Sequence, residues 1–256
     1  MVIKFGPAGL GPAKTAEDVL ENLHRAGLRA CEIAFTYSVY LKPDDALRIG
    51  KKAEKLEIEL SVHASYYCNL NSDEKSKVEA TKKRILEAAE IADILKAKVV
   101  VFHPGYYGKN KEGAYENIKK GILDIQKKMK EKGLKVKLAP ETTGKVNVFG
   151  SIDEISKLVK ETGCSFCIDF AHVLAREKKI DFDKIKKAFP QKEWHCHFSG
   201  IIYGEKGERK HRSTEKDEWV NLLKNLPKNK KIRILNESPT MIDDSIEGLE
   251  IYEKIN

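Results

Sequence analysis

The stretch VVVFHPGYY, residues 99–107, runs four apolar residues directly into His103, Pro104 and Gly105. An uninterrupted run of β-branched and aromatic residues predicts a strand that is buried on both faces, as in a parallel sheet. Pro104 and Gly105 end this strand, so His103 is expected at its C-terminal tip. A single histidine there is more often a hydrogen-bonded structural residue than a ligand. The question is whether other strands end in the same way.

Strand-like runs alternate with helical stretches along the whole chain. The expected strands are 2–5, 30–35, 58–63, 98–103, 135–141, 165–170, 193–199 and 232–237. The expected helices are 15–26, 44–56, 73–96, 112–132, 152–161, 182–188, 216–225 and 243–254. Eight strands, each followed by a helix, predict an α/β protein with a closed (β/α)8 TIM barrel, here as a single domain over 1–256. An open doubly wound sheet is the alternative, but GPAGLG (6–11) fits neither a dinucleotide loop nor a P-loop.

The composition predicts a soluble cytoplasmic protein with no membrane association. Hydrophobic residues make up 41% and charged residues 34% of the chain, and no apolar stretch approaches a membrane span. The N-terminus lacks the apolar core of a signal peptide, and five cysteines without a framework spacing suit a reducing compartment. The net charge of +8 suits a polyanion such as nucleic acid, although Lys-rich surfaces also occur in heat-adapted proteins.

Metal-ligating residue types stand at the ends of six consecutive expected strands. In chain order they are His63, His103, Glu141, Asp169, His197 and Glu237, and His172 and His211 follow in nearby loops. The C-terminal ends of all strands of a (β/α)8 barrel face one rim, so we expect a metal site there. Imidazole and carboxylate together favour Zn²⁺, with Mn²⁺ as a rival. Eight candidate ligands exceed one coordination sphere, so we expect two or three ions, with Glu141 as a bridge.

Other polar residues near these strands have simpler interpretations. His195 lies two residues before His197, on the same side of its strand but deeper, and is expected in the core. The Cys164–Cys167 pair is a lone CxxC, which favours packing over zinc or redox chemistry. Tyr66 and Tyr67 follow His63 and are either loop packing or aromatics that stack on a base or sugar.

Six segments, taken together, resemble the endonuclease IV family of apurinic/apyrimidinic endonucleases, within the xylose-isomerase-like TIM-barrel superfamily. They are VHASYYCNL (62–70), FHPG (102–105), PETTG (140–144), CIDFAH (167–172), HFSG (197–200) and LNESP (235–239), and their order covers nearly the whole chain. The resemblance implies a trinuclear zinc site that cleaves DNA on the 5′ side of an abasic nucleotide. It implies one zinc held by His63 and His103 with Glu141 as the bridge. A second would be held by Asp169, His197 and Glu237, and a third by His172 and His211, while Tyr66 would enter the DNA at the lesion.

The chain departs from the family pattern at the third zinc. An aspartate usually stands two residues before the histidine that matches His211, and here that position holds Arg209. Arginine stays protonated and does not coordinate a metal. Either a carboxylate of the same loop, Glu205 or Glu208, takes the place of the aspartate, or the third metal is weakly held. From the sequence we expect the weak metal.

The leading hypothesis is therefore a zinc-dependent DNA repair endonuclease of base excision repair, acting as a monomer on double-stranded DNA with abasic sites. Glu141 is the expected catalytic residue, and Lys42, Lys109 and Arg212 are expected to hold flanking phosphates. The alternative is a sugar isomerase or epimerase with one divalent ion, usually Mn²⁺, in a core that resembles Glu141, Asp169, His197 and Glu237. A metal-binding or DNA-binding module without catalysis is a third hypothesis.

Overall fold

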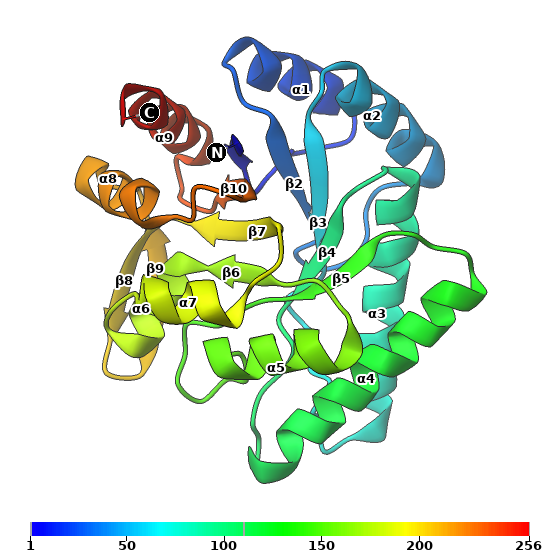
Figure 1. The fold of residues 1–256 in the computed structure, drawn as a ribbon. Coiled ribbons are helices and arrows are strands. Elements are labelled where there is room, and N and C mark those ends of the chain that lie inside the picture. The colour runs from blue at the N-terminus through cyan, green and yellow to red at the C-terminus, as the bar shows by residue number, and fades with distance from the viewer. Residues whose placement is uncertain (1, 110, 256) are drawn as a thin grey trace.

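Parallel strand pairing organises the chain into two halves of one barrel (Figure 1). The structure, a computed structural model, describes residues 2–109 and 111–255. The first half has the order β1 (Val2–Pro7), β10 (Lys231–Asn236), β7 (Glu193–Phe198) and β6 (Cys167–Asp169). The second half has the order β2 (Ala30–Ala34), β3 (Glu59–His63), β4 (Val99–Phe102) and β5 (Lys137–Pro140). All pairs within the two halves are parallel, as the uninterrupted apolar runs predict.

Backbone hydrogen bonds close the barrel at the two seams between these halves. Between β1 and β2, the Arg29 amide donates to the Phe5 carbonyl at 3.0 Å. Gly6 makes this approach feasible, because a Cβ at that position would lie 1.6 Å from the carbonyl oxygen of Ala30. Between β5 and β6, the Ser165 amide donates to the Leu138 carbonyl at 2.7 Å. The predicted (β/α)8 barrel is therefore confirmed.

Helices surround the barrel on its outside (Figure 1). In chain order they are α1 (Ala16–Arg25), α2 (Pro43–Lys55), α3 (Lys75–Ile94), α4 (Lys111–Glu131), α5 (Ile152–Thr162), α6 (Phe170–Glu177), α7 (Phe182–Ala188), α8 (Lys216–Asn225) and α9 (Met241–Ile255). A capping box of Ser151 and Glu154 begins α5, and Gly163 ends it in the left-handed conformation at φ 68°. None of these helices combines the length and the apolar composition that crossing a membrane requires.

Two elements differ from the sequence prediction, and both shape the rim. The segment after β6 turns at once into α6, where the Asp169 side chain caps the helix by accepting from the His172 amide at 2.8 Å. From the apolar run, the sequence predicts instead that the strand continues to residue 170. The expected polar loop after β7 is a hairpin of β8 (Gly200–Gly204) and β9 (Gly207–Arg212), which pair antiparallel.

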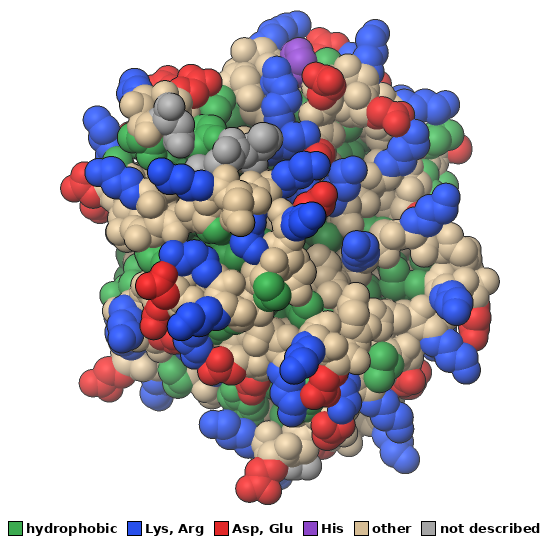
Figure 2. All heavy atoms as spheres, in the orientation of Figure 1, with side chains coloured by type: hydrophobic (Ala, Val, Ile, Leu, Met, Phe, Trp, Pro, Cys, Tyr) green, Lys and Arg blue, Asp and Glu red, His purple; other side chains and the backbone are tan. Residues whose placement is uncertain are grey.

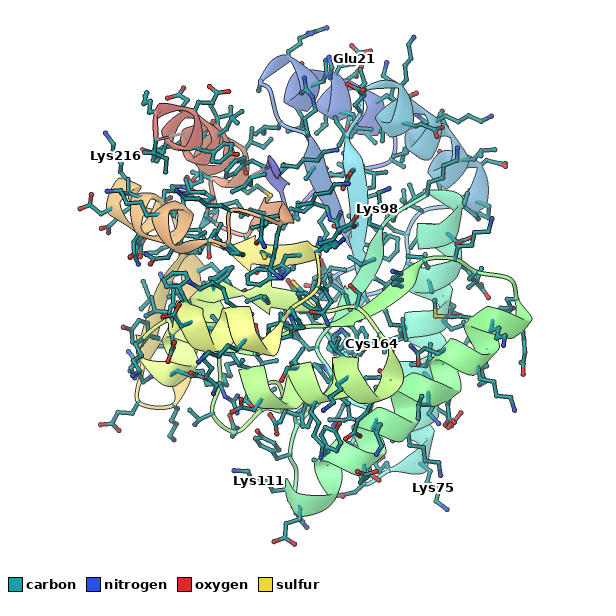
Figure 3. The ribbon with its side chains drawn as sticks, viewed as in Figure 1. Glu21, Lys75, Lys98, Lys111, Cys164 and Lys216 are labelled. Carbon is teal, nitrogen blue, oxygen red and sulfur yellow. The ribbon has the colours of Figure 1, made fainter. Side chains whose placement is uncertain are left out.

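Charged side chains lie at the N-terminal end of the barrel, opposite the candidate metal ligands. Glu59 accepts from Lys4 at 3.0 Å and from Arg233 at 2.7 Å, which fixes three strands to one another. Figures 1 to 3 look onto this end, where Lys98 is labelled in Figure 3 and basic side chains stand near the middle of Figure 2. The C-terminal rim, with the candidate ligands, faces away from the viewer.

Candidate metal centre

The predicted ligands come together at the C-terminal rim in three overlapping groups. Within each group the ligand atoms lie within 4.8 Å of one another. The groups are His63, His103 and Glu141; Glu141, Asp169, His197 and Glu237; and Asp169, His172, His211 and Glu237. Because the carboxylates Glu141, Asp169 and Glu237 each belong to two groups, the arrangement suits neighbouring ions that share ligands.

Glu141, at the end of β5, is fully buried at the centre of the rim. Its Oε2 lies 3.2 Å from His63 Nε2 and 3.0 Å from His103 Nε2. Its Oε1 lies 3.3 Å from His197 Nδ1 and 3.2 Å from His172 Nδ1. Two ligands of one zinc ion, each about 2.1 Å from it, stand at comparable separations. A carboxylate whose two oxygens face different histidines has the geometry of a bridge between two ions.

The hydrogen bonding of the buried rim atoms bears on whether these residues fit a metal. Glu141 Oε1, Asp169 Oδ2 and His197 Nδ1 are buried and lack a hydrogen-bond partner among the described residues. A buried polar atom without a partner costs free energy, and a buried charge costs more. A divalent cation would satisfy all three atoms at once. The rim residues therefore fit a divalent metal, and the mixture of imidazole and carboxylate suits Zn²⁺ or Mn²⁺.

Crowding of charge at the rim alters the pKa values of these groups. Burial raises the pKa of Glu237 to about 8, and the nearby carboxylates Glu141 and Asp169 act in the same direction. Burial alone would lower the pKa of His172, but Asp169 and Glu141 raise it well above its usual value. The metal-free rim therefore holds protons at the positions that a metal would neutralise, and metal uptake must release them.

Backbone and hydroxyl groups orient the histidines around the rim. His63 Nδ1 donates to the Ala64 carbonyl at 2.7 Å, and His172 Nδ1 lies 3.0 Å from the Thr142 carbonyl. His211 Nδ1 lies 2.6 Å from Ser199 Oγ. In each case a second interaction fixes one ring nitrogen and leaves Nε2 directed to the rim, which is how metal-ligating histidines are usually held.

Glu208 takes the place that the sequence left open beside His172. Its Oε2 lies 3.4 Å from His172 Nε2. In the hairpin, Lys210 pairs with Ile202 and Glu208 pairs with Tyr203, so Arg209 is an extra, bulged residue. Without a bulge, residues 208 and 211 would point to opposite faces of β9.

With the bulge, Glu208 and His211 both face the rim, while the exposed Arg209 packs over Gly204. Glu205, the other candidate, is exposed near the hairpin turn. The geometry thus favours Glu208 over Glu205 as the carboxylate that could replace the aspartate, and the strength of the third metal site stays a prediction.

We expect Glu208→Ala to lower the metal content by about one ion per chain, because His172 and His211 would lose their nearest additional carboxylate. Elemental analysis after dialysis measures this directly. Glu205→Ala, in the same hairpin, is the matched control and should keep the full content. Equal metal content in both variants would show that Glu208 is not a ligand.

The residues predicted to contact DNA differ in how exposed they are and in whether other residues already bind them. Tyr66 and Tyr67 are 48% and 61% exposed, and the Tyr66 ring lies 5.4 Å from the His63 ring and 5.7 Å from the His103 ring. Lys42 and Lys109 are exposed. Arg212 is held in two hydrogen bonds to Glu218, at 3.0 and 2.8 Å, so its guanidinium is already occupied.

Sequence analysis missed two residues of this region. Lys145 lies in the loop after β5 and lines a cavity of about 230 Å³ beside the ligands, together with Tyr66, His103, Tyr106, His172 and Glu208. No sequence pattern predicts that a lone lysine in a loop lies at this position.

Glu32 is fully buried in β2. The sequence does mark this residue, since it is a single carboxylate within the apolar run ACEIAF.

Two curated proteins are similar to this chain in sequence, one over the whole chain and the other over about half of it. The uncharacterized protein MJ0133 of Methanocaldococcus jannaschii is 35% identical over 274 residues, covering 100% of this chain and 98% of that protein. The "Probable endonuclease 4" of Thermoplasma volcanium is 32% identical over 143 residues, covering 54% of this chain and 49% of that protein. The second match concerns only about half of each protein.

Solved structures of similar fold include both nucleases and sugar epimerases. Endonuclease IV from Thermus thermophilus has a TM-score of 0.71 at 20% identity, covering 99% of this chain and 98% of that one. D-Psicose 3-epimerase from Clostridium cellulolyticum, with D-tagatose, has a TM-score of 0.69 at 14% identity, covering 100% and 99%. At these identities the likeness concerns the fold. The family model described as "Xylose isomerase-like TIM barrel" matches residues 20–240, and the chain therefore belongs to that family.

Proposed function

We propose that this chain is a zinc-dependent endonuclease that hydrolyses the phosphodiester bond on the 5′ side of an abasic nucleotide in duplex DNA and leaves a 3′-hydroxyl. The observation that carries the proposal is the number and overlap of the ligand groups. Glu141, Asp169, His197 and Glu237 already make a complete set for one ion. The additional histidines, at positions 63, 103, 172 and 211, are more than a one-ion site requires and complete two further groups.

The charge of a rim filled with metals would also favour a phosphodiester over a neutral sugar. Four carboxylates, from Glu141, Asp169, Glu208 and Glu237, contribute −4 at the rim when ionised. One divalent ion would leave −2, which repels a phosphodiester, whereas three ions would leave +2, which attracts it. A rim filled to the capacity of its ligands is therefore suited to an anionic substrate.

Residues around the ligands have the chemistry to place such a substrate. Zinc bound at the rim would act as a Lewis acid and make hydroxide available near neutral pH. Glu141, between two pairs of histidines, would orient the attacking water with its carboxylate. The 230 Å³ cavity is smaller than the roughly 300–1,000 Å³ that drug-sized ligands occupy, so it suits a sugar–phosphate unit. Lys145, on its wall, would hold the phosphate.

A sugar epimerase is the second candidate, and one specific observation favours it. The four-residue group around Glu141 is sufficient by itself for a single ion that polarises a carbonyl and an adjacent hydroxyl. The similar fold of the D-psicose 3-epimerase agrees with such chemistry. The partial similarity to "Probable endonuclease 4" supports the nuclease instead.

The test is strand cleavage of a duplex oligonucleotide that carries one abasic site, run beside an epimerisation assay on a ketohexose with the same preparation. We expect a single nick 5′ to the lesion, a 3′ end that a polymerase extends, and loss of cleavage in chelator. An intact duplex of the same sequence is the control. Epimerisation without nicking would reject the nuclease in favour of the second candidate.

We expect Tyr66→Ala to weaken binding to the abasic duplex more than to the intact duplex. The half-exposed ring lies beside His63 and His103, and loss of one stacking aromatic costs about 1–3 kcal/mol. Fluorescence anisotropy with both duplexes measures the difference. Tyr37→Ala is a matched control, since Tyr37 is 72% exposed and lies beside Tyr67. Equal losses on both duplexes would remove Tyr66 from lesion recognition.

A further inference from the structure

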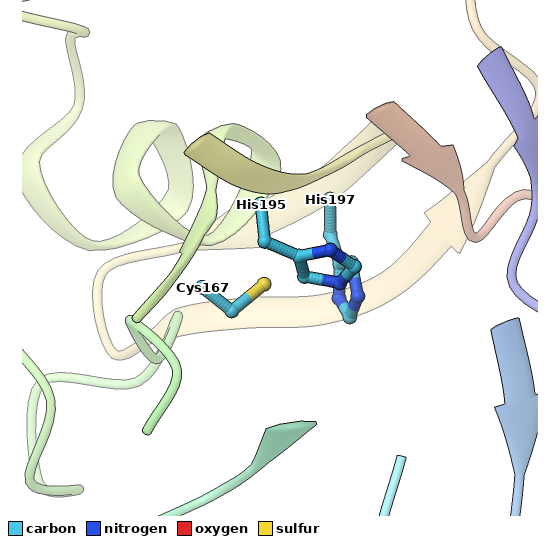
Figure 4. Close-up of side chains that lie close together, drawn as sticks. All are labelled: Cys167, His195 and His197. Atoms are coloured by element: carbon cyan, nitrogen blue, oxygen red, sulfur yellow. The ribbon is translucent and has the colours of Figure 1, made fainter. Parts of the chain in front are cut away.

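Beneath the metal centre, Glu32 reaches across the barrel interior from β2 to β7. Its Oε2 accepts from Ser61 Oγ at 2.8 Å and from His195 Nε2 at 3.2 Å. Its Oε1 lies 3.0 Å from His197 Nε2. In Figure 4, His195 and His197 point toward one another beside the thiol of Cys167. His197 thus has a carboxylate on its inner side and the rim ligands on its outer side.

The two nitrogens of His197 face different groups. Nε2 faces Glu32, whereas Nδ1 lies 3.3 Å from Glu141 Oε1 and 3.3 Å from Glu237 Oε1. A neutral imidazole carries its proton on one nitrogen and its lone pair on the other. With the proton directed to Glu32, the lone pair is directed to the two rim carboxylates, where an ion would bind.

A purely structural role does not account for a carboxylate at this position. Glu32 is fully buried, and its Oε2 is hydrogen-bonded to the Ser61 hydroxyl and the His195 ring. Its Oε1 lies 3.0 Å from His197 Nε2 without a hydrogen bond between them, and no Lys or Arg among the described residues pairs with Glu32. Burial of a charge costs several kcal/mol, and apolar residues of similar volume often replace buried ionic groups without loss of stability. Glu59, at the N-terminal end of the barrel, differs because it is partly exposed and because Lys4 and Arg233 neutralise it.

We propose that Glu32 is a positioning residue of the metal centre, which holds His197 as the Nε2-protonated tautomer so that Nδ1 is the metal ligand. The inference rests on the metal centre of the proposed function but not on the identity of the substrate. His195 and Ser61 in turn hold Glu32 in place. Carboxylates behind a metal-ligating histidine typically contribute a factor of about 10–100 in metal affinity.

The test measures zinc affinity by chelator competition, together with the ring tautomer by ¹⁵N-histidine NMR of the zinc-loaded protein. We expect Glu32→Gln to raise the zinc dissociation constant by about 10–100-fold, and the His197 ring of the unmodified protein to carry its proton on Nε2. Glu59→Gln is the control, a partly exposed carboxylate at the N-terminal end of the barrel, away from the candidate ligands. It should lower the melting temperature and leave zinc affinity unchanged.

Two results would overturn the proposal. One is a Glu32→Gln variant that binds zinc as tightly as the unmodified chain. The other is a His197 ring with its proton on Nδ1, which needs no variant and so does not depend on how the substitution folds. An unmodified protein that binds no zinc would instead reject the metal centre itself, so failure of the proposed function is recognised separately.

Discussion

Glu141→Gln is expected to reduce cleavage of the abasic duplex by at least about 1,000-fold in kcat/KM, equivalent to roughly 4 kcal/mol of transition-state stabilisation. The amide keeps the size of the side chain but replaces one carboxylate oxygen with a nitrogen that does not bind a cation. Because the two oxygens of Glu141 face different histidines, the substitution removes a fully buried carboxylate from between the first two ligand groups. Steady-state kinetics on the abasic duplex measures the loss.

The control for this prediction is Glu87→Gln, which makes the same chemical change on the outer surface of α3. Glu87 has an exposed ion pair with Lys83. Its variant should retain full activity. A Glu141→Gln variant with more than about a tenth of the original activity, a loss of less than roughly 1.4 kcal/mol, would contradict the role assigned to the bridge.

Removal of the metals is expected to lower the melting temperature by about 8–16 °C. At a free metal concentration of about 1,000 times the dissociation constant, binding to the native state alone contributes about 4.1 kcal/mol. For a chain of this size, 1 kcal/mol corresponds to roughly 2–4 °C. The direction follows from the structure, because metal-free protein buries Glu141 Oε1 and Asp169 Oδ2 without hydrogen-bond partners among the described residues.

Differential scanning calorimetry before and after chelation measures this shift, and addition of zinc should restore the original melting temperature. The Glu141→Gln variant should show a smaller shift on chelation than the unmodified chain. A chain whose melting temperature is the same with and without chelator would show that no tightly held ion contributes to its stability.

The barrel could be predicted from the sequence because its strands are buried on both faces. Runs such as Val99–Phe102 then contain no polar alternation, and Pro104 and Gly105 mark the end of the strand. The main candidate ligands could be predicted for the same reason. Each of His63, His103 and Glu141 breaks an apolar run at its C-terminal end, and the barrel places all such ends on one rim.

The positions of the other site residues could not be predicted, because they depend on contacts between segments that are distant in sequence or on a local irregularity of a strand. Glu208 faces His172 only because a bulge at Arg209 shifts the alternation of β9, and a bulge is set by the register of the hairpin. Glu32 meets His197 across the barrel, from a strand that is not its neighbour in either half. Neither contact follows from the period of a single strand.

A cluster of metals at the rim, rather than a single ion, is what separates the proposed nuclease from the epimerase. Elemental analysis of active protein after extensive dialysis, normalised to protein by amino-acid analysis, tests it most directly. We expect two to three tightly bound divalent ions per chain, mostly zinc, because the ligand groups around Glu141, Asp169 and Glu237 exceed one coordination sphere. A stoichiometry of one or below in fully active protein would contradict it and favour the epimerase.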